Sequence, residues 1–304
     1  MDHFDTFKAG DLTAVIGDNA ASGKHRAGYN GVWSLVHKNE PENLFVPEVA
    51  GLNFEHIFDG DKQDEDDSRK VFFEPRKAPM TFKKLSATSA ELHQPPTPAF
   101  RLESWTRFDL VAPHYLDMTF RCRPTQHCFA FGYIGLFWAN YINAPEDKSI
   151  YFRGRERWQQ LCTQEHNDES TVRHRDDKQQ LKFSEKYGDA LFKNMSRLRF
   201  DEPFFYGLFK KHIFLVMFDR TAGIRFAHSP SGGGDNKEHQ TTLPAWDFQW
   251  ILPTFEVLTE YSFRARVVYR ERCSRTEVMK EFQKWRHELS KQEDQPMEPN
   301  QGPM

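Results

Sequence analysis

The sequence predicts an all-β protein, a large antiparallel β-sandwich with one C-terminal helix. Several segments alternate apolar and polar side chains with a period of two, which is the pattern of a strand with one buried face. The chain is also rich in Phe, with 28 among 304 residues, and aromatic side chains favour sheets. Helical segments do not alternate regularly with these strands, which disfavours a doubly wound α/β fold.

The most strongly patterned part of the chain is Phe100–Phe152, which is rich in aromatic residues. Alternate residues are apolar in Leu102–Leu110 and again in Leu116–Cys122, so each segment is expected to be a half-buried strand. Phe129–Tyr141 is almost continuously apolar, as a strand covered on both faces would be. It runs into the polar, turn-forming sequence Asn140–Asp147, so we expect a functional site at this strand end.

The same patterns indicate strands in much of the remaining chain. Leu52–Phe58 alternates and places His56 on an apolar face, where we interpret it as a core histidine. Pro203–Asp219 is apolar on both sides of Lys210-Lys211 and is expected to form a β-hairpin. The other expected strands are Asp11–Ile16, Asn30–His37, Val71–Glu74, Met80–Glu91, Trp158–Thr163, Ile224–His228, Ala245–Leu252 and Tyr261–Arg270.

Polar tracts separate several of these segments. Asp59–Lys70 is acidic, but the position of Gly60 does not match a calcium loop, and we interpret the tract as a solvated loop. Lys178–Asn194 is expected to form a short helix or a long loop. Ser229–Asp235 is glycine-rich and lacks the Lys of a phosphate-binding loop, so we interpret it as a flexible connection.

One helix is expected, near the C-terminus. Ser274 and Glu277 have the spacing of a capping box, in which each side chain binds the backbone N–H of the other residue. Apolar residues then recur at helical spacing; they are Val278, Phe282, Trp285 and Leu289. We expect a single domain over residues 1–290 in which helix 274–290 docks on the sheet, followed by a disordered polar tail over residues 291–304.

Composition disfavours several classes of partner. The formal charge is −3, from 41 basic and 44 acidic residues, and no basic block stands out, so nucleic-acid binding is not expected. No apolar run approaches about 18 residues, so no membrane span is expected. The four cysteines are scattered and no secretory signal is visible, so we expect reduced thiols in a cytoplasmic protein.

The densest group of titratable residues is Gln164–Asp177, which contains His166 and His174. Histidine titrates near neutral pH and suits proton transfer. The segment has neither the HExxH nor the HxH spacing of a metal site, and we predict no metal and no cofactor. The alternative is an ordinary polar loop.

A carboxylate and an amide share one face of the expected strand Ala245–Leu252. Asp247 and Gln249 alternate there with tryptophan and phenylalanine, and such a pair can bind neighbouring hydroxyls of a sugar. The alternative is an ion pair between Asp247 and an arginine of the next expected strand, Arg264 or Arg266.

The order of segments resembles the galactose mutarotase-like supersandwich, the fold of aldose epimerases and of many sugar-binding proteins. The resemblance covers about Leu12 to Arg270. It rests on the strands of Phe100–Phe152, on Trp138–Asn143, and on the pair Pro244–Gln249 and Tyr261–Arg270. It implies a sugar or sugar acid bound on the concave sheet.

Two positions differ from the aldose epimerase pattern. In that family the strand run reads roughly His-x-Tyr-Phe-Asn, with the histidine as the acid. Tyr141 and Asn143 match its end, but Ala139 stands at the histidine position. Asp247-Phe-Gln249 is only superficially similar to the family's late Glu-x-Gln motif. The resemblance therefore implies the fold more directly than the activity.

These observations lead to one functional hypothesis and two alternatives. We expect a protein that binds a small-molecule carbohydrate, and if it is an enzyme, an isomerase, epimerase or lyase that uses a histidine and a carboxylate for proton transfer. The alternatives are a non-catalytic carbohydrate-binding or scaffold module and a metal-dependent hydrolase. The expected catalytic residues are His166, His228 and Asp247. The expected substrate-binding residues are Asn140, Tyr141, Asn143, Gln249 and Arg264.

Overall fold

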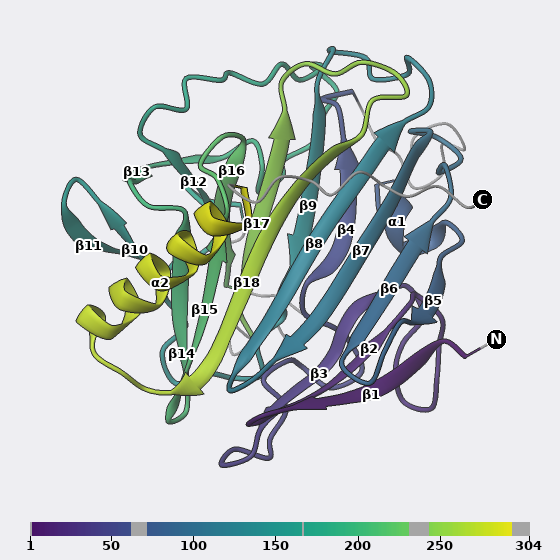
Figure 1. Ribbon diagram of the computed structural model, residues 1–304. Helices are drawn as coiled ribbons and strands as arrows, with labels where there is room; N and C mark the ends of the chain where they lie inside the picture. The colour runs from purple at the N-terminus through teal and green to yellow at the C-terminus, as the bar shows by residue number, and fades with distance from the viewer. Residues whose placement is uncertain (1, 62–71, 166, 231–242, 294–304) are drawn as a thin grey trace.

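Strands dominate the computed structural model of the protein, which describes residues 2–61, 72–165, 167–230 and 243–293. They form sheets of nine, six and three strands. Figure 1 shows the two large sheets stacked, with the three-stranded sheet across one end and a long helix on the outer side of the nine-stranded sheet. The predicted all-β sandwich with a C-terminal helix is confirmed.

The nine-stranded sheet is antiparallel throughout. Its strands, in spatial order, are β11 (Arg157–Leu161), β10 (Ile150–Gly154), β14 (Phe204–Phe209), β15 (His212–Phe218), β18 (Tyr261–Glu271), β8 (Tyr115–Pro124), β7 (Leu102–Val111), β6 (Ser89–Gln94) and β5 (Thr81–Lys84). The expected hairpin around Lys210-Lys211 is confirmed as β14 and β15.

The six-stranded sheet contains one parallel pair, β13 with β12, and is otherwise antiparallel. Its strands, in spatial order, are β13 (Met195–Phe200), β12 (Thr171–His174), β16 (Ile224–Ser229), β17 (Ala245–Leu252), β9 (Ile134–Ala139) and β4 (Asn53–Phe58). The small sheet consists of β1 (Phe4–Ala9), β2 (Leu12–Gly17) and β3 (Gly31–His37).

The main core lies between the two large sheets. Trp138 of β9 is completely buried and stacks on Phe54 of β4 and Phe248 of β17, with ring centroids 5.0 and 5.1 Å away. Phe120 and Phe263 of the nine-stranded sheet meet the same indole edge-on. Such aromatic packing explains why the sequence carries so many Phe residues on alternating strand positions.

Helix α2 (Arg275–Glu293) docks on the outer side of the nine-stranded sheet. The capping box is confirmed: the Ser274 hydroxyl accepts from the Glu277 N–H at 3.3 Å, and Glu277 accepts from the Ser274 N–H at 2.8 Å. The apolar stripe is buried against β14, β15 and β18. The helix runs to Glu293, three residues beyond the predicted end, and the rest of the expected tail lies outside the described residues.

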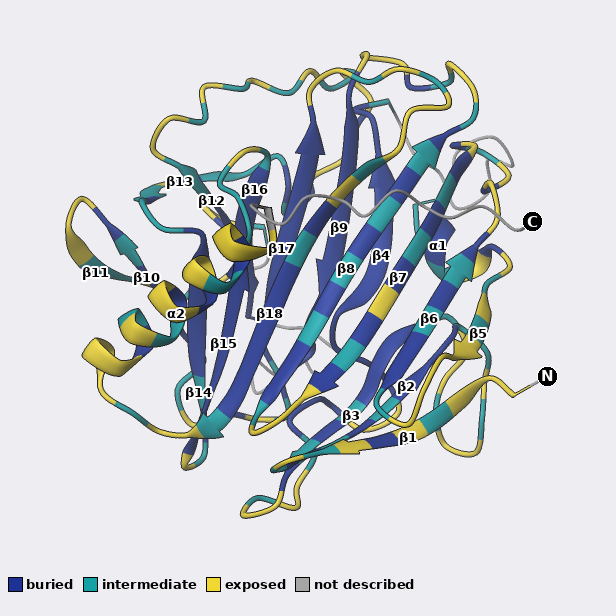
Figure 2. Ribbon diagram, in the orientation of Figure 1, coloured by how far each residue is buried: buried dark blue, intermediate teal, exposed yellow. Residues whose placement is uncertain are grey.

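The outer faces of the two large sheets differ in exposure. Strands β7 and β8 alternate between buried and partly exposed residues, whereas every residue of β4, β9, β16 and β17 is buried. Figure 2 shows this contrast as banded strands in the nine-stranded sheet and uniformly dark strands behind it. Phe129–Tyr141, expected as a strand covered on both faces, is such a strand only in β9; residues 129–133 form a turn region.

Some sequence predictions are wrong in detail. The described end of the expected strand Val71–Glu74 begins a short helix, α1 (Glu74–Lys77), which has Pro75 in its first turn. Met80–Glu91 contains a turn and is split between β5 and β6. Lys178–Asn194 is a loop, one of its two expected forms. Strands β1, β10, β12 and β13 were not predicted, because they are short or polar.

The alternation expected in Leu52–Phe58 is broken by a β-bulge between Phe54 and His56. Phe54 and Ile57 face the core between the sheets, whereas Glu55 and His56 both contact groups on the opposite side of the sheet. A bulge adds one residue to a strand and therefore reverses the face of those that follow.

No helix in the described residues is long and apolar enough to cross a membrane. All four cysteines are free in the structure.

Candidate functional site

The outer face of the six-stranded sheet, called here the covered face, lies mainly under loops, with the short helix α1 packed on β4. Aromatic residues from two loop regions, including Tyr29 before β3 and Phe192 before β13, pack with Phe58 and Phe137 of the sheet. Phe192 stacks on Phe58 with ring centroids 3.9 Å apart. The covered face nevertheless carries charged side chains, and a buried charge needs partners to be tolerated.

The first group of these side chains surrounds Glu55 of β4, which is 5% exposed. The Tyr141 hydroxyl donates to Glu55 Oε2 at 2.5 Å, and Asn53 Nδ2 donates to the same oxygen at 3.1 Å. Arg76 Nη1 donates to Glu55 Oε1 at 3.5 Å. Burial raises the pKa of Tyr141 well above its usual range, and the charge of Glu55 adds to this effect.

His56 lies beside this carboxylate, with Nε2 3.7 Å from Glu55 Oε1. Its Nδ1 is 2.7 Å from the carbonyl of Phe72. A carbonyl only accepts, so Nδ1 carries the proton and Nε2 has a free lone pair in the neutral ring. Burial lowers the pKa of His56 and favours this neutral form. His56 is thus buried and bonded, as expected, but it lies on the covered face, between Glu55 and a group of aromatic rings, rather than in the core between the sheets. The rings are those of Phe72, Phe73, Phe137 and Phe192.

Arg76 connects the Glu55 cluster, defined as Asn53, Glu55, His56, Arg76 and Tyr141, to a cavity. Its guanidinium lies 3.9 Å from the ring centre of Tyr29 and 4.6 Å from that of Phe73. Its Nε donates to the Gly28 carbonyl at 2.9 Å. The cavity has a volume of about 590 Å³ and is lined by Asn19, Ala27, Gly28, Phe73, Arg76, Lys77, Ala78 and Pro79.

Asp247 is next to this cluster on β17 and is 1% exposed. Its Oδ1 accepts from the Asn140 N–H at 2.9 Å. Burial raises its pKa well above the usual range, and the negative charge of Glu55 raises it further. The side chain of Asn140 donates to the Trp246 carbonyl at 2.6 Å and accepts from the Leu52 N–H at 2.8 Å. Asn140 therefore joins β9, β17 and the entry to β4.

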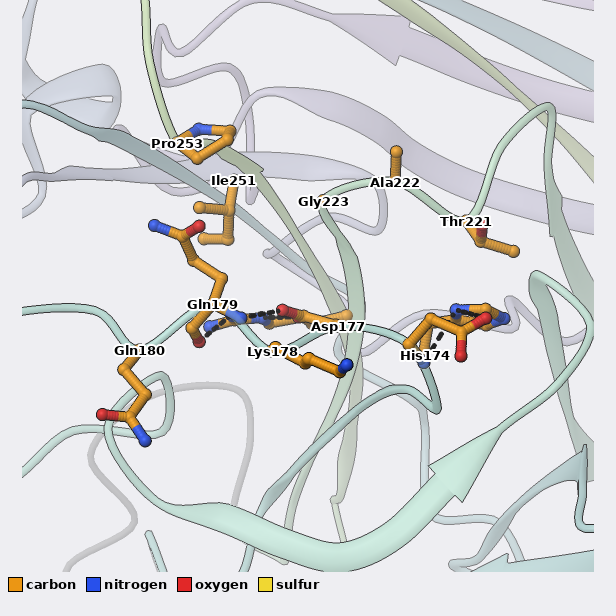
Figure 3. Close-up of a pocket in the computed structure, with 12 residues that line it drawn as sticks. His174, Asp177, Lys178, Gln179, Gln180, Thr221, Ala222, Gly223, Ile251 and Pro253 are labelled. Atoms are coloured by element: carbon orange, nitrogen blue, oxygen red, sulfur yellow. Dashed lines mark hydrogen bonds and ion pairs between the residues drawn. The ribbon is translucent and has the colours of Figure 1, made fainter.

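Gln249 lies on the same face of β17 as Asp247, two residues further along. Its cross-strand neighbour is Arg225 of β16, which is 1% exposed. Arg225 Nε donates to Asp177 Oδ2 at 2.8 Å and Nη2 donates to the Gln179 carbonyl at 3.1 Å. Arg225 also lines a second cavity, of about 710 Å³. Figure 3 shows Asp177 and Gln179 on one side of it and Gly223 on another.

The other expected site residues lie elsewhere. Both nitrogens of His228 are occupied: Nδ1 is 2.7 Å from Thr163 Oγ1, and Nε2 is 2.8 Å from the Lys148 carbonyl. Burial lowers its pKa to about 4. Asn143 donates to Glu42 at 3.0 Å in an exposed position. His166 lies outside the described residues.

Arg264 is separated from Asp247. It belongs to β18 in the nine-stranded sheet and donates to Gln292 of helix α2 at 2.7 Å. Arg266 of the same strand pairs with Asp117 and with Glu288 of α2. The alternative of an ion pair between Asp247 and one of these arginines is wrong, because β17 and β18 lie in different sheets.

Within the described ranges, no group of three or more His, Cys, Asp or Glu side chains is arranged to hold a metal ion. His174 Nδ1 lies 3.8 Å from Asp176 Oδ2, at the edge of the larger cavity.

Sequence reasoning did not find Glu55, Arg76 or Arg225. Glu55 gave a weak signal, as a carboxylate in a strand whose other residues include Phe54, Ile57 and Phe58. Arg76 could not be placed because it lies between the expected strands Val71–Glu74 and Met80–Glu91, where no element was expected. The bulge in β4 could not be seen either, and it is what brings Glu55 and His56 to one face.

The fold is that of the galactose mutarotase-like β-supersandwich, as predicted. The structure is similar to a galactose mutarotase related enzyme from Lactobacillus acidophilus, with a TM-score of 0.51, 11% identity, and coverage of 88% of this chain and 97% of that one. It is also similar to a GalM/aldose epimerase homologue from C. elegans, with a TM-score of 0.52, 9% identity, and coverage of 88% and 98%.

No family model matches the sequence, and no curated protein matches it. At such low identities, the structural likeness establishes the fold alone.

Proposed function

We propose that the protein binds a carbohydrate on the covered face, at the Glu55 cluster and the 590 Å³ cavity beside it. The observation that carries the proposal is Glu55 itself, a buried carboxylate held by Tyr141, Asn53 and Arg76. A fixed carboxylate next to amide and guanidinium donors suits the hydroxyls of a sugar, and the ring of Phe73 in the cavity wall suits its C–H face.

The fold supports the same proposal by analogy. The two similar structures are described as mutarotase-related or aldose epimerase proteins. A shared fold does not carry a function with it, so the argument rests on the residues of this chain.

Isothermal titration calorimetry with D-galactose, D-glucose and lactose tests the proposal. We expect at least one sugar to bind, and Glu55→Gln and Phe73→Leu each to weaken binding by about tenfold or more, because each removes a direct contact. Glu91→Gln is the control, since Glu91 belongs to β6 in the other sheet. The Phe73 variant keeps the test decisive if Glu55→Gln does not fold. Equal binding by all four proteins would place the sugar elsewhere.

We propose proton transfer at the sugar, as in mutarotation or epimerisation, as the second function of this site. The observation that favours it is the free Nε2 of neutral His56 beside Glu55 and the Tyr141 hydroxyl. The three groups offer a base, a carboxylate and an acid within one cluster. His56 thus replaces His228, whose nitrogens are both occupied.

Polarimetry of freshly dissolved α-D-galactose and α-D-glucose tests this second function. We expect the wild-type protein to accelerate the approach to anomeric equilibrium, and His56→Gln and Tyr141→Phe to slow it by roughly 10²–10⁴-fold. If the wild-type protein binds sugar but leaves the rate at the buffer value, the site is a binding site without this chemistry.

A further inference from the structure

Three arginines form a row across neighbouring strands of the six-stranded sheet. Arg173 of β12 is the register partner of Arg199 in β13 on one side and of Arg225 in β16 on the other. Directly paired residues point to the same face of a sheet, and adjacent strands are about 4.8 Å apart. We call Arg173, Arg199 and Arg225 the arginine row; Gln249 continues it on β17.

Internal partners balance only part of this positive charge. Among the described residues, Asp177 is the carboxylate that forms an ion pair with the row, through Arg225. Arg173 Nη1 donates to the Gln179 carbonyl at 3.4 Å, and Arg199 Nη1 donates to the carbonyls of Ser196 and Leu198, each at 2.7 Å. Carbonyls accept hydrogen bonds but do not neutralise charge. Burial, together with Arg173, lowers the pKa of Arg199, as expected for crowded cations.

The row also contains buried polar atoms that lack hydrogen-bond partners within the described residues. They are Arg173 Nε, Arg225 Nη1 and Gln249 Oε1. The orientation of the Gln249 amide is fixed: the Thr171 hydroxyl donates to the Leu191 carbonyl at 2.7 Å, so it accepts from Gln249 Nε2 at 3.0 Å. Unsatisfied buried polar atoms are rare in native proteins and require an explanation.

One of these residues, Arg225, lines a cavity, and Arg173 and Gln249 are its register partners on the two neighbouring strands. The volume of the cavity is about 710 Å³, and Arg225 and Ile251 form its floor on the sheet. Polar side chains of the loop after β12 surround it, among them Lys178, Gln179 and Gln180, as Figure 3 shows for the labelled residues. The carboxylates of Asp176 and Asp177 also line the cavity; Asp177 is paired with Arg225, and the side chain of Asp176 is 81% exposed. Beside them the cavity offers a buried guanidinium, an ammonium group and amides to a ligand that enters it.

We propose that this cavity binds the anionic group of an acidic carbohydrate, a carboxylate, sulfate or phosphate. The inference rests on the proposed carbohydrate binding and extends it to this second cavity, which shares no lining residue with the first, with an acidic ligand. The anion accepts from Arg225 Nη1 and Arg173 Nε, and a neighbouring hydroxyl of the same ligand donates to Gln249 Oε1. Planar guanidinium groups bind such oxygens with charge-assisted hydrogen bonds. One ligand thus satisfies two donors and one acceptor that the chain leaves open.

Calorimetric titrations at constant ionic strength test the proposal. The probes are D-glucuronate, D-glucose 6-phosphate and D-glucose 6-sulfate, compared with neutral D-glucose and with inorganic phosphate and sulfate. We expect at least one acidic sugar to bind wild type about tenfold or more tighter than D-glucose. Arg173→Gln and Arg225→Lys should remove that preference. Arg197→Gln, on the same strand as Arg199 but 94% exposed, should keep it.

The outcomes separate this proposal from the proposed function. Binding of D-glucose with no preference for acidic forms would overturn the anion site and leave sugar binding intact. Binding of inorganic phosphate or sulfate that depends on Arg173, without binding of any sugar, would support the anion site and overturn the sugar. A preference that survives in Arg173→Gln would also overturn the anion site, and this variant remains informative if Arg225→Lys fails to fold.

Discussion

The two large sheets share one core, but the charged side chains on their outer faces differ in how far they are exposed to solvent. On the nine-stranded sheet, Arg107 of β7 is 51% exposed and pairs with Asp109 in contact with solvent. On the six-stranded sheet, Glu55 and Arg225 are 5% and 1% exposed. A surface ion pair changes the free energy of folding little. A buried charge loses its hydration and destabilises the fold unless it is fully paired.

This difference shows where the chain departs from the simplest stable sandwich. Replacing buried ionic groups by apolar ones of similar volume is often neutral or stabilising. Strained or costly polar groups that are kept on one face therefore indicate a function there. The outer face of the nine-stranded sheet also carries such groups, but they are less buried or pair with helix α2. Arg266 pairs with Glu288, and Arg123 and Arg153, whose Nε atoms lack partners among the described residues, are only half-buried.

The largest expected effect is the difference in stability between two variants, each of which lacks one arginine on one of the two faces. Arg225→Met should lower the free energy of unfolding by about 3–5 kcal/mol, because Asp177 loses its buried partner. Arg107→Met should lower it by about 1 kcal/mol or less, because its pair with Asp109 is solvated. Urea unfolding of both variants measures the difference. Equal losses would mean that the two faces do not differ energetically.

A smaller effect is expected from His228, which is buried with a pKa lowered to about 4. Its folded pKa lies below its unfolded value, so its contribution to stability is complete above about pH 6.5 and is lost as pH falls through about 4. A shift of this size corresponds to about 3 kcal/mol. Between pH 7 and pH 4, His228→Gln should lose less stability than wild type by about that amount. Parallel pH profiles would contradict the expectation.

The smallest effect is expected for Asp247→Asn. The pKa of Asp247 is raised by burial, so the carboxyl stays neutral to higher pH than usual, and asparagine keeps an acceptor for the Asn140 N–H. The change should cost about 1 kcal/mol or less near neutral pH. A raised folded pKa means that the carboxyl's contribution is present below its unfolded pKa and lost as pH rises through the folded value.

The variant should therefore gain stability relative to wild type as pH rises, which chemical denaturation across a pH series measures. A loss of several kcal/mol that grows with pH would instead show that Asp247 is an ionised, paired carboxylate.

The sequence was sufficient for the fold because strands with one buried face leave a period-two pattern. Leu102–Leu110 and the capping box at Ser274 are local signals, and both are confirmed. The site was harder to predict, since it depends on contacts between distant segments. Arg76 reaches Glu55 across 21 residues, and Tyr141 reaches it across 86. No local pattern encodes such pairings.

Whether an expected site residue reaches the covered face depends on which sheet its strand joins. Tyr141, Asp247 and Gln249 lie on or beside strands β9 and β17, whose pairing places them on the covered face. The side chain of Asn140 bonds backbone groups of Trp246 and Leu52. Arg264 was assigned to the same face because two similar alternating strands follow each other in the chain. Alternation identifies a strand but does not say which of two sheets it joins.

Hydrogen exchange with and without a bound sugar tests the central claim, that the covered face holds the ligand, most directly. The probe is whichever of D-galactose, D-glucose and D-glucuronate binds tightest, at a saturating concentration. Amides of residues 72–79 and 139–142 should exchange more slowly when the sugar is bound, because their segments line the Glu55 cluster or its cavity. Exchange in residues 81–94, which form β5 and β6, should not change. Slowing confined to residues 81–94 would contradict the claim.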